Sequence, residues 1–274
     1  MKATLHNHTI HSDGTKTIKE INDLAIKNNF DVVAITDHDT LDGYYDILEL
    51  DTPVRFIIGV EMSTVHKNKN VHVLGYFPTV NENVIKFFQN MRKERIDRCK
   101  KMIYNLRKYE NIDITFEEVS KLASGSIGRP HIAKVISEKL GITSSEVFDK
   151  YIGNDSKSYV SVGKIETEDG VKFLKDNGAI VSLAHPIQIK GFDFEEILDY
   201  GFDAIEVYHP DQDDEYSNML RKVAKKHKLI VTGGSDYHGN NHSSVFEKSF
   251  IEDKDLDVFL EKFDGLKKIN KKIK

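Results

Sequence analysis

The 274-residue sequence contains a single cysteine, Cys99, and no tryptophan. One cysteine excludes an intramolecular disulfide framework and any zinc site built from several thiolates. No apolar run approaches the roughly 20 residues that a membrane-spanning helix needs, and the N-terminus lacks a secretory signal pattern. We therefore expect a cytoplasmic protein without a membrane association.

Several catalytic sequence motifs are also missing. The sequence has no Walker loop, no dinucleotide-binding fingerprint and no Gly-x-Ser-x-Gly elbow, which disfavours kinases, ATPases, nicotinamide enzymes and serine hydrolases. The 39 Lys plus Arg residues and 44 Asp plus Glu residues give a formal net charge of −5. This charge provides no broad basic field for nucleic acid, so we expect no stable DNA partner and only short, locally held substrates.

Short β-branched runs alternate with amphipathic helical stretches through most of the chain. Continuous apolar runs fit strands that are buried on both faces, as in a parallel sheet. Seven repetitions of strand and helix indicate an α/β barrel or a doubly wound sheet. The predicted strands are Ala3–His8, Val32–Thr36, Phe56–Glu61, Val71–Tyr76, Ala179–His185, Ala204–His209 and Leu229–Ser235.

One predicted helix has a recognisable start. The stretch Ile18–Asn28 places its apolar residues on one face, as expected of a helix that covers a sheet. Thr17 precedes it and Glu20 follows three residues later, which is the spacing of a capping box. We therefore predict that this helix begins directly after Thr17.

The alternation of strands and helices is interrupted in the middle of the chain. From about Asn81 to Gly163 the pattern is helical, including a long charged stretch from Val84 to Tyr109. We interpret residues 81–163 as a helical insertion or cap domain, and residues 1–80 with 164–274 as a discontinuous barrel domain. The charged stretch is interpreted as a solvated helix face rather than a nucleic-acid patch.

Histidine is the residue whose number and positions are unusual. The chain has 12 histidines, and polar side chains stand at or just beyond six of the seven predicted strand ends. In an α/β barrel the loops at the carboxyl ends of the strands form the active site. These residues therefore predict one shared site: His6, His8, Asp37, His38, Glu61, His185, His209, Asp236 and His238.

The spacing within two pairs supports a metal site. His6 and His8, like Asp236 and His238, are two residues apart, so in extended backbone both side chains of a pair point to one side, about 7 Å apart. One cation can bridge that span. Imidazole and carboxylate ligands without thiolates suit zinc, manganese or iron.

Six sequence segments resemble, in order, the motifs of the PHP (polymerase and histidinol phosphatase) family. That resemblance covers most of the chain and implies a distorted (β/α)7 TIM-like barrel with two or three divalent metal ions, which hydrolyses phosphoesters. The segments are Leu5–Thr9 (LHNHT), Ser12–Gly14 (SDG), Ala34–Asp39 (AITDHD), Gly59–Glu61 (GVE), Ala184–Pro186 (AHP) and Gly234–His238 (GSDYH).

The insertion narrows the resemblance to one branch. Its segment Gly128–Ala133 (GRPHIA) is similar to members that remove the 3′ phosphate from nucleoside 3′,5′-bisphosphates, some of which trim short RNA from a 5′-phosphorylated end. The substrate implied is therefore a small phosphorylated molecule, a nucleotide or short RNA. The sequence favours no particular oligomeric state.

The resemblance also implies a ligand set for each metal ion, with manganese favoured over iron and zinc. A bridging carboxylate is chemically needed where two cations lie close together. His6, His8, Glu61 and Asp236 would bind the first ion; Glu61, His72 and His185 the second; and Asp13, His38 and His238 the third.

Two of the predicted ligands have competing interpretations, and a third residue, Asp37, is assigned a supporting role. His72 lies inside a predicted strand, where a core histidine is the alternative to a ligand. Asp13 belongs to a Ser-Asp-Gly turn signal, although the resemblance makes it a ligand. Asp37 is interpreted as a carboxylate that orients a metal-bound imidazole.

Substrate contacts are predicted for Arg129, His131 and His209. The guanidinium of Arg129 offers a two-pronged donor to phosphate oxygens, and it stands at a helix start that itself attracts phosphate. Glu61, His238 and His131 are the predicted catalytic residues, the two histidines as groups that assist the leaving oxygen.

We therefore expect metal-dependent phosphoester hydrolysis without a covalent enzyme intermediate. Histidinol phosphate, AMP or another small monoester is the alternative substrate, because the metal site would be the same. An inactive accessory or binding module of the same family is the alternative of another class.

Overall fold

The computed structural model of this protein describes residues 1–123, 125, 127–160, 163, 165–240 and 245–272. The chain divides into two compact units. Met1–Lys86 together with Lys164–Lys274 form the first, the barrel unit, and Phe87–Gly163 form the second, the helical unit.

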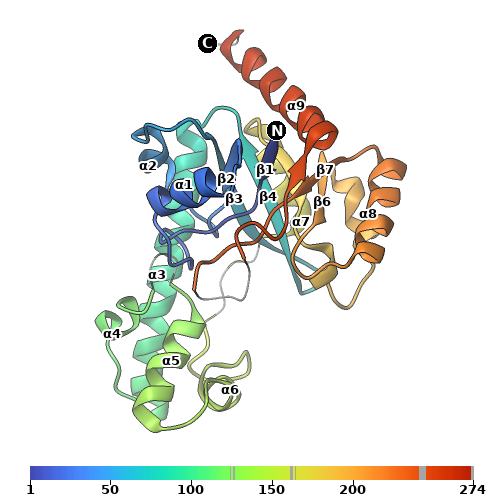
Figure 1. Ribbon diagram of the computed structural model, residues 1–274. Coiled ribbons are helices and arrows are strands. Elements are labelled where there is room, and N and C mark those ends of the chain that lie inside the picture. Colours follow the sequence, from blue (N-terminus) through green and yellow to red (C-terminus); the bar gives the residue numbers. More distant parts are fainter. Residues whose placement is uncertain (124, 126, 161–162, 164, 241–244, 273–274) are drawn as a thin grey trace. The chain divides into compact units, whose positions relative to one another are not determined.

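Within its described residues the barrel unit contains one sheet of eight strands, in the order β7-β6-β5-β4-β3-β2-β1-β8 (Figure 1). The sheet nearly closes, because the N–H of Leu5 donates to the carbonyl oxygen of Gly233 at 3.0 Å and Asn7 bridges to Tyr237. The predicted α/β barrel is confirmed. Its strands are β1 (Lys2–Thr4), β2 (Val32–Ile35), β3 (Arg55–His66), β4 (Lys69–Phe77), β5 (Ile180–Leu183), β6 (Ala204–Tyr208), β7 (Ile230–Gly233) and β8 (Ile251–Glu252).

Two strands differ from the predicted (β/α)7 pattern. β4 runs antiparallel to both β3 and β5, because only Lys67 and Asn68 connect it to β3. These two residues have φ values of 48° and 61°, as in the two-residue turns that close β-hairpins. The second difference is β8, a short strand that pairs antiparallel with β1. The reversal brings the first half of β4, rather than its end, beside the carboxyl ends of the parallel strands.

Helices cover the outside of the barrel, and the first begins as predicted. Thr17 Oγ1 accepts from the N–H of Glu20 at 3.2 Å, and Glu20 Oε2 accepts from the N–H of Thr17 at 2.9 Å, so the capping box is confirmed. None of the helices in the described ranges is both long and apolar enough to cross a bilayer. The helices of this unit are α1 (Ile18–Lys27), α2 (Tyr44–Leu48), α7 (Thr167–Asp176), α8 (Asp214–His227), α9 (Asp253–Lys272) and the short 3₁₀ helices η2 (Pro186–Gln188) and η3 (Phe194–Tyr200).

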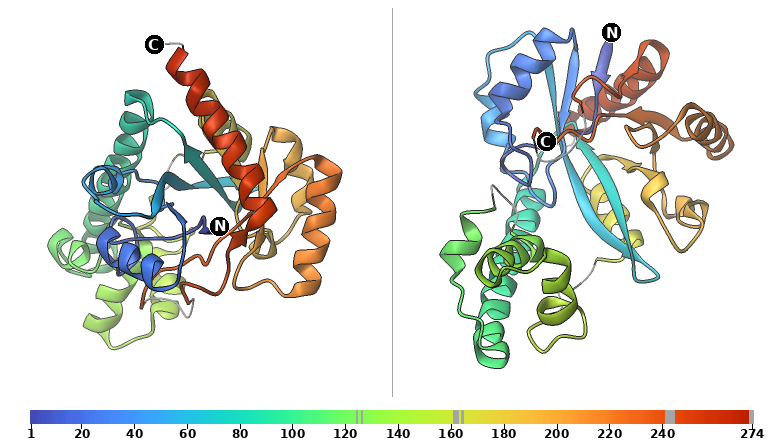
Figure 2. Two further views of the ribbon diagram at one scale, coloured as in Figure 1. Left: turned by 45° about the horizontal axis from the view of Figure 1, so that its top comes forward. Right: turned by 60° about the horizontal axis from the view of Figure 1, so that its bottom comes forward.

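Helix α9 closes the barrel end at which the parallel strands begin (Figure 2). Phe259 and Phe263 of α9 are buried in one cluster with residues of the barrel interior, such as Tyr76. The rings of Phe259 and Tyr76 meet edge to face, with centroids 5.2 Å apart. Because this end is filled by apolar side chains, the loops at the other end are the ones free to form a polar site.

The helical unit has an apolar core of its own. Cys99, Met102 and Leu106 of α3 are buried there against Ile132 and Ile136 of α5. The boundary between the two units falls within α3, whose first residues belong to the barrel unit. The helices concerned are α3 (Glu82–Glu110), α4 (Phe116–Ser120), α5 (Arg129–Leu140), α6 (Ser144–Val147) and the π-helical turn η1 (Phe148–Ile152).

Candidate metal centre

The predicted metal ligands meet at the barrel end where the parallel strands finish. Glu61 lies within β3, and His72 lies within the reversed strand β4, opposite Ser63 in the register and therefore close to Glu61. The antiparallel hairpin thus explains how a histidine in mid-strand reaches the site. The other predicted ligands follow strands or stand in the loops beyond them: His6, His8 and Asp13 after β1, His38 after β2, His185 after β5, and Asp236 and His238 after β7.

Glu61 is the centre of the cluster, and its carboxylate is buried. Its Oε2 lies 3.1 Å from each of three imidazole nitrogens, His6 Nε2, His8 Nε2 and His38 Nδ1. Its Oε1 lies 2.8 Å from His72 Nδ1 and 2.7 Å from His185 Nε2. One carboxylate therefore faces five imidazoles, with a different group at each oxygen, which is the arrangement of a bridging ligand.

Asp236 adds a second carboxylate on the His6 side of the cluster. Its Oδ1 lies 3.3 Å from His6 Nε2 and 3.1 Å from His8 Nε2, while its Oδ2 lies 3.2 Å from His209 Nε2. His209, predicted to contact substrate, thus lies against a predicted ligand and lines the same cavity.

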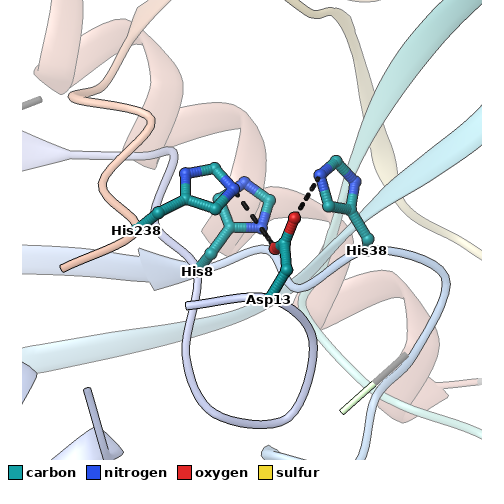
Figure 3. Close-up of side chains that lie close together, drawn as sticks. All are labelled: His8, Asp13, His38 and His238. Atoms are coloured by element: carbon teal, nitrogen blue, oxygen red, sulfur yellow. Dashed lines mark ion pairs between the residues drawn. The ribbon is translucent and has the colours of Figure 1, made fainter. Parts of the chain in front are cut away.

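Asp13 joins His8, His38 and His238 at the other side of the cluster (Figure 3). Its Oδ1 lies 3.2 Å from His238 Nε2, and its Oδ2 lies 3.7 Å from His38 Nε2. The rings of His8 and His238 stack with centroids 3.9 Å apart. His238 Nδ1 lies 2.8 Å from the backbone oxygen of Asp236. When Nδ1 carries the proton of this hydrogen bond, the lone pair of Nε2 is available to the site.

Potential ligand atoms gather in three sets. One set has the members predicted from the sequence. The set around Asp13 contains His8 in addition to the predicted members, and the set of Glu61 and His72 contains His38. His185 remains beside His72 at Oε1 of Glu61. The sets, each within 4.8 Å, are His6, His8, Glu61 and Asp236; His38, Glu61 and His72; and His8, Asp13, His38 and His238.

The donor atoms fit divalent cations. His6 Nε2, His8 Nε2, His38 Nδ1 and Glu61 Oε2 are buried and make no hydrogen bond with the described residues. Buried polar atoms without partners are costly, yet here they converge around one carboxylate oxygen. A cation shared among them removes that cost, and nitrogen with carboxylate oxygen suits manganese, iron or zinc.

The electrostatics of the cluster favour positive charge. Burial lowers the pKa of His8, but the adjacent carboxylates of Asp236 and Glu61 raise it to about 10. Burial also lowers the pKa of His6, but the neighbouring carboxylates raise it well above 6.5. By contrast, burial lowers the pKa of His38 to about 4. Without a cation, the centre therefore collects protons on His6 and His8.

Asp37 has a different role from the one predicted. Its carboxylate accepts from the N–H and the hydroxyl of Thr9, both at 2.7 Å, and from the hydroxyl of Ser12 at 2.5 Å. It therefore holds the loop that carries Asp13, and the interpretation that it orients an imidazole is wrong. The donors of Thr9 and Ser12 supply the hydrogen bonds of this carboxylate, and no imidazole nitrogen of the described residues takes part.

Glu206 is the site residue that the sequence analysis missed. It lies in β6 and is completely buried. Its Oε1 and Oε2 lie 3.0 and 3.2 Å from His6 Nδ1, and Oε2 accepts from the N–H of His185 at 2.8 Å. A proton held on Nδ1 leaves the lone pair of His6 Nε2 facing Glu61. The available signal was a charged residue inside an apolar strand, which needs a buried partner.

Arg129 and His131 belong to the helical unit. Arg129 donates from Nη1 to Asn154 Oδ1 at 3.0 Å, and its guanidinium lies over the rings of Phe148 and Tyr159. His131 Nδ1 accepts from the N–H of Gly128 at 3.1 Å, at the start of α5. Their contact with substrate stays a prediction.

Comparisons with known proteins give a family profile and several similar proteins. Residues 4–155 match the profile of the family described as PHP domain. The 5′-3′ exoribonuclease Rnm of Salmonella typhimurium is 28% identical over 246 residues, which cover 85% of this chain and 84% of that protein. A 3′,5′-nucleoside bisphosphate phosphatase of Chromobacterium violaceum is 26% identical over 249 residues, 85% of this chain and 86% of that protein.

A crystal structure agrees with the fold. A proposed metal-dependent phosphoesterase from Bifidobacterium adolescentis superposes with a TM-score of 0.77 at 28% identity, covering 95% of this chain and 96% of that chain. These relatives agree with the sequence-based expectation of a hydrolase acting on phosphoric esters.

Proposed function

Because the chain belongs to the PHP domain family, we propose that it is a metal-dependent phosphoesterase that removes phosphate from nucleotides. The observation that carries the proposal is the arrangement around Glu61, where five imidazole nitrogens lie 2.7 to 3.1 Å from the two carboxylate oxygens. An inactive accessory module would have lost some of these groups, whereas every predicted ligand is present.

Two or three divalent ions fit the residues of this centre, with manganese favoured. We assign Glu61 as the bridging ligand, because each of its oxygens faces different imidazoles. The first ion would take its remaining ligands from His6, His8 and Asp236, the second from His72 and His185, and a third from Asp13, His38 and His238.

When bound, these ions lower the pKa of a water molecule and neutralise charge on the phosphoryl oxygens. The chain itself orients the ligands. Glu206 holds the proton of His6 on Nδ1, which keeps Nε2 directed at the centre. His238 is held by the backbone oxygen of Asp236 through Nδ1. Its Nε2 therefore faces the cavity, either as a ligand or, when protonated, as the donor to the leaving oxygen.

The proposed substrates are nucleoside 3′,5′-bisphosphates and short RNA with a 5′ phosphate. The names of the two enzyme relatives support both substrates. The formal net charge of −5 favours short substrates, because long RNA needs an extended basic surface. Arg129 and His131 are proposed to bind substrate phosphate. We also propose a cytoplasmic location, which is consistent with a nucleotide substrate.

A substrate panel tests this function. The wild-type protein, loaded with Mn²⁺, is assayed with a nucleoside 3′,5′-bisphosphate, a 5′-phosphorylated oligoribonucleotide, histidinol phosphate and AMP. We expect phosphate release from the bisphosphate and mononucleotides from the oligoribonucleotide. Activity confined to histidinol phosphate or AMP would overturn the substrate assignment, and no activity with any of the four would favour the accessory module.

Two variants test the role of the central carboxylate. Glu61→Gln removes the bridging charge and should abolish turnover while the far-ultraviolet circular dichroism stays that of the wild type. Glu49→Gln makes the same change on the exposed end of α2 and should keep full activity. Appreciable turnover by Glu61→Gln with a full complement of metal contradicts the assignment.

A further inference from the structure

One lysine lines the metal cavity among the described residues of the barrel unit. The cavity has a volume of about 270 Å³, and its wall contains the carboxylates and imidazoles of the centre together with Lys248. Within the described chain the ammonium group of Lys248 has no ion pair, although the carboxylates of Asp13, Glu61, Asp211 and Asp236 share the cavity wall. An exposed lysine at the edge of such a centre is available to an anion from solution.

The backbone around Lys248 is anchored to the metal centre. Ser235, next to the predicted ligand Asp236, contacts the carbonyl oxygen of Phe246 through its hydroxyl and that of Ser249 at 3.1 Å. Phe246 and Ser249 are buried, whereas Lys248 between them is exposed. The backbone on either side of Lys248 is therefore held by hydrogen bonds, and its exposed side chain can adjust to a ligand.

A second cavity, of about 590 Å³, adjoins the metal cavity and shares His209 and Lys248 with it. Its volume lies within the range of small-molecule sites, about 300–1,000 Å³. Gln212 contributes an Oε1 atom that is buried and makes no hydrogen bond with the described residues, and Asp214 contributes a carboxylate. Such acceptors suit the hydroxyl and amine donors of a nucleoside. Of the two further cations in the wall, Arg221 is paired with Asp255, and Lys254 is exposed.

We propose that Lys248 binds the substrate phosphate that is not hydrolysed, and that the adjoining cavity holds the nucleoside that joins the two phosphates. This inference rests on the proposed function, because it names the part of that substrate which the metal centre does not bind. A bisphosphate presents one phosphate to the centre and leaves a second, charged phosphate to be recognised. Lys248 offers that phosphate an ammonium group, and the side cavity takes the uncharged portion.

The test compares adenosine 3′,5′-bisphosphate with adenosine 3′-monophosphate, each with Mn²⁺, as substrates of the wild type and three variants. Lys248→Gln should lower the ratio of kcat/KM for the bisphosphate to that for the monophosphate about tenfold, through KM, which corresponds to about 1.4 kcal/mol. Lys248→Arg keeps the charge and should restore most of the ratio. Lys222→Gln removes the same charge from an exposed position on α8 and should leave the ratio unchanged.

The outcomes separate this inference from the proposed function. An unchanged ratio in Lys248→Gln, or an equal fall in Lys222→Gln, overturns the role of Lys248 while the phosphatase stands. If the wild type hydrolyses neither nucleotide, the proposed function fails. Calorimetric binding of the two nucleotides to the Mn²⁺-loaded proteins then tests Lys248 alone, and a loss of preference for the bisphosphate in Lys248→Gln supports it. No such loss contradicts it.

Discussion

Glu206 accepts the Nδ1 proton of His6 with both carboxylate oxygens, at 3.0 and 3.2 Å, and one of them also accepts from the backbone of His185. A single buried carboxylate thus orients one predicted ligand and fixes the main chain of another. His185 has a φ of 25°, a strained value for a residue other than glycine, and this hydrogen bond helps to hold it.

We expect Glu206→Gln to weaken Mn²⁺ binding about 10- to 100-fold, the usual effect of losing a partner behind a ligating histidine. The amide offers one oxygen to two N–H donors, so its NH₂ group must face one of them. Calorimetric titration of metal-free protein measures the change.

Thr232→Val is the matched control for Glu206→Gln, because it removes a buried hydrogen bond to Ser182 of 2.8 Å from a neighbouring strand without touching a ligand. It should keep the affinity of the wild type for Mn²⁺. Equal affinities in wild type and Glu206→Gln would show that Glu206 has no positioning role.

Metal affinity should rise with pH. In the metal-free protein the pKa of His6 is raised well above 6.5 and that of His8 to about 10. At neutral pH both side chains are therefore imidazolium ions, with a proton on each ring nitrogen. A divalent ion binds neutral imidazole and must displace these protons, so affinity increases about tenfold per pH unit for each proton released. For His8 this increase continues until the pH approaches 10.

Titrations at pH 6, 7 and 8, each in two buffers of different ionisation enthalpy, give the affinity and the number of protons released. Affinity that is independent of pH across this range, with no proton release, would contradict the protonation of His6 and His8 in the metal-free protein.

Removal of the metal ions should destabilise the barrel unit. Chelation removes divalent charge from beside the buried carboxylate of Glu61, and protons on His6 and His8 replace it only with single charges. We expect the Tm to fall on chelation and to recover with added Mn²⁺, since a ligand at 100 times its Kd stabilises by about 2.7 kcal/mol. Scanning calorimetry measures the shift, and Glu61→Gln should show a smaller recovery. A Tm unaffected by chelation and by Mn²⁺ would mean that the centre binds no ion tightly.

The sequence predicted the barrel, and it indicated which histidines and carboxylates lie together, because both leave local signals. Strand-sized apolar runs mark the barrel, and histidines or carboxylates at strand ends mark the centre. The reversal of β4 could not be predicted in the same way, since Lys67 and Asn68 do not form one of the glycine-containing pairs that usually indicate a hairpin.

The roles of Glu206 and Lys248 could not be predicted from the sequence for a related reason. Each acts through a contact between distant segments: Glu206 lies 200 residues from His6 along the chain, and Lys248 meets the cavity through a loop anchored on Ser235. The neighbours of Lys248 in the sequence do not suggest its role, and the apolar strand around Glu206 indicates a buried partner without identifying it. Asp37 shows the opposite error, because its position beside His38 suggested an imidazole partner, whereas its hydrogen bonds go to Thr9 and Ser12.

The packing of α9 against the barrel makes a prediction about stability that is separable from the metal centre. Phe259 is completely buried against Tyr76, whereas its neighbour Val258 is 42% exposed. Phe259→Ala should reduce the free energy of unfolding by about 3–5 kcal/mol, because it leaves a cavity at the closed end of the barrel. Val258→Ala should change it by less than about 0.5 kcal/mol.

Urea unfolding of the full chain, followed by circular dichroism, measures both values, and metal analysis of the folded proteins provides the second readout. Phe259 lies at the end where the parallel strands begin and the ligands lie where they finish, so the folded Phe259→Ala protein should bind as many Mn²⁺ ions as the wild type. Equal destabilisation by the two substitutions would contradict the packing of α9. Loss of bound metal from folded Phe259→Ala would mean that the closed end of the barrel controls the geometry of the centre.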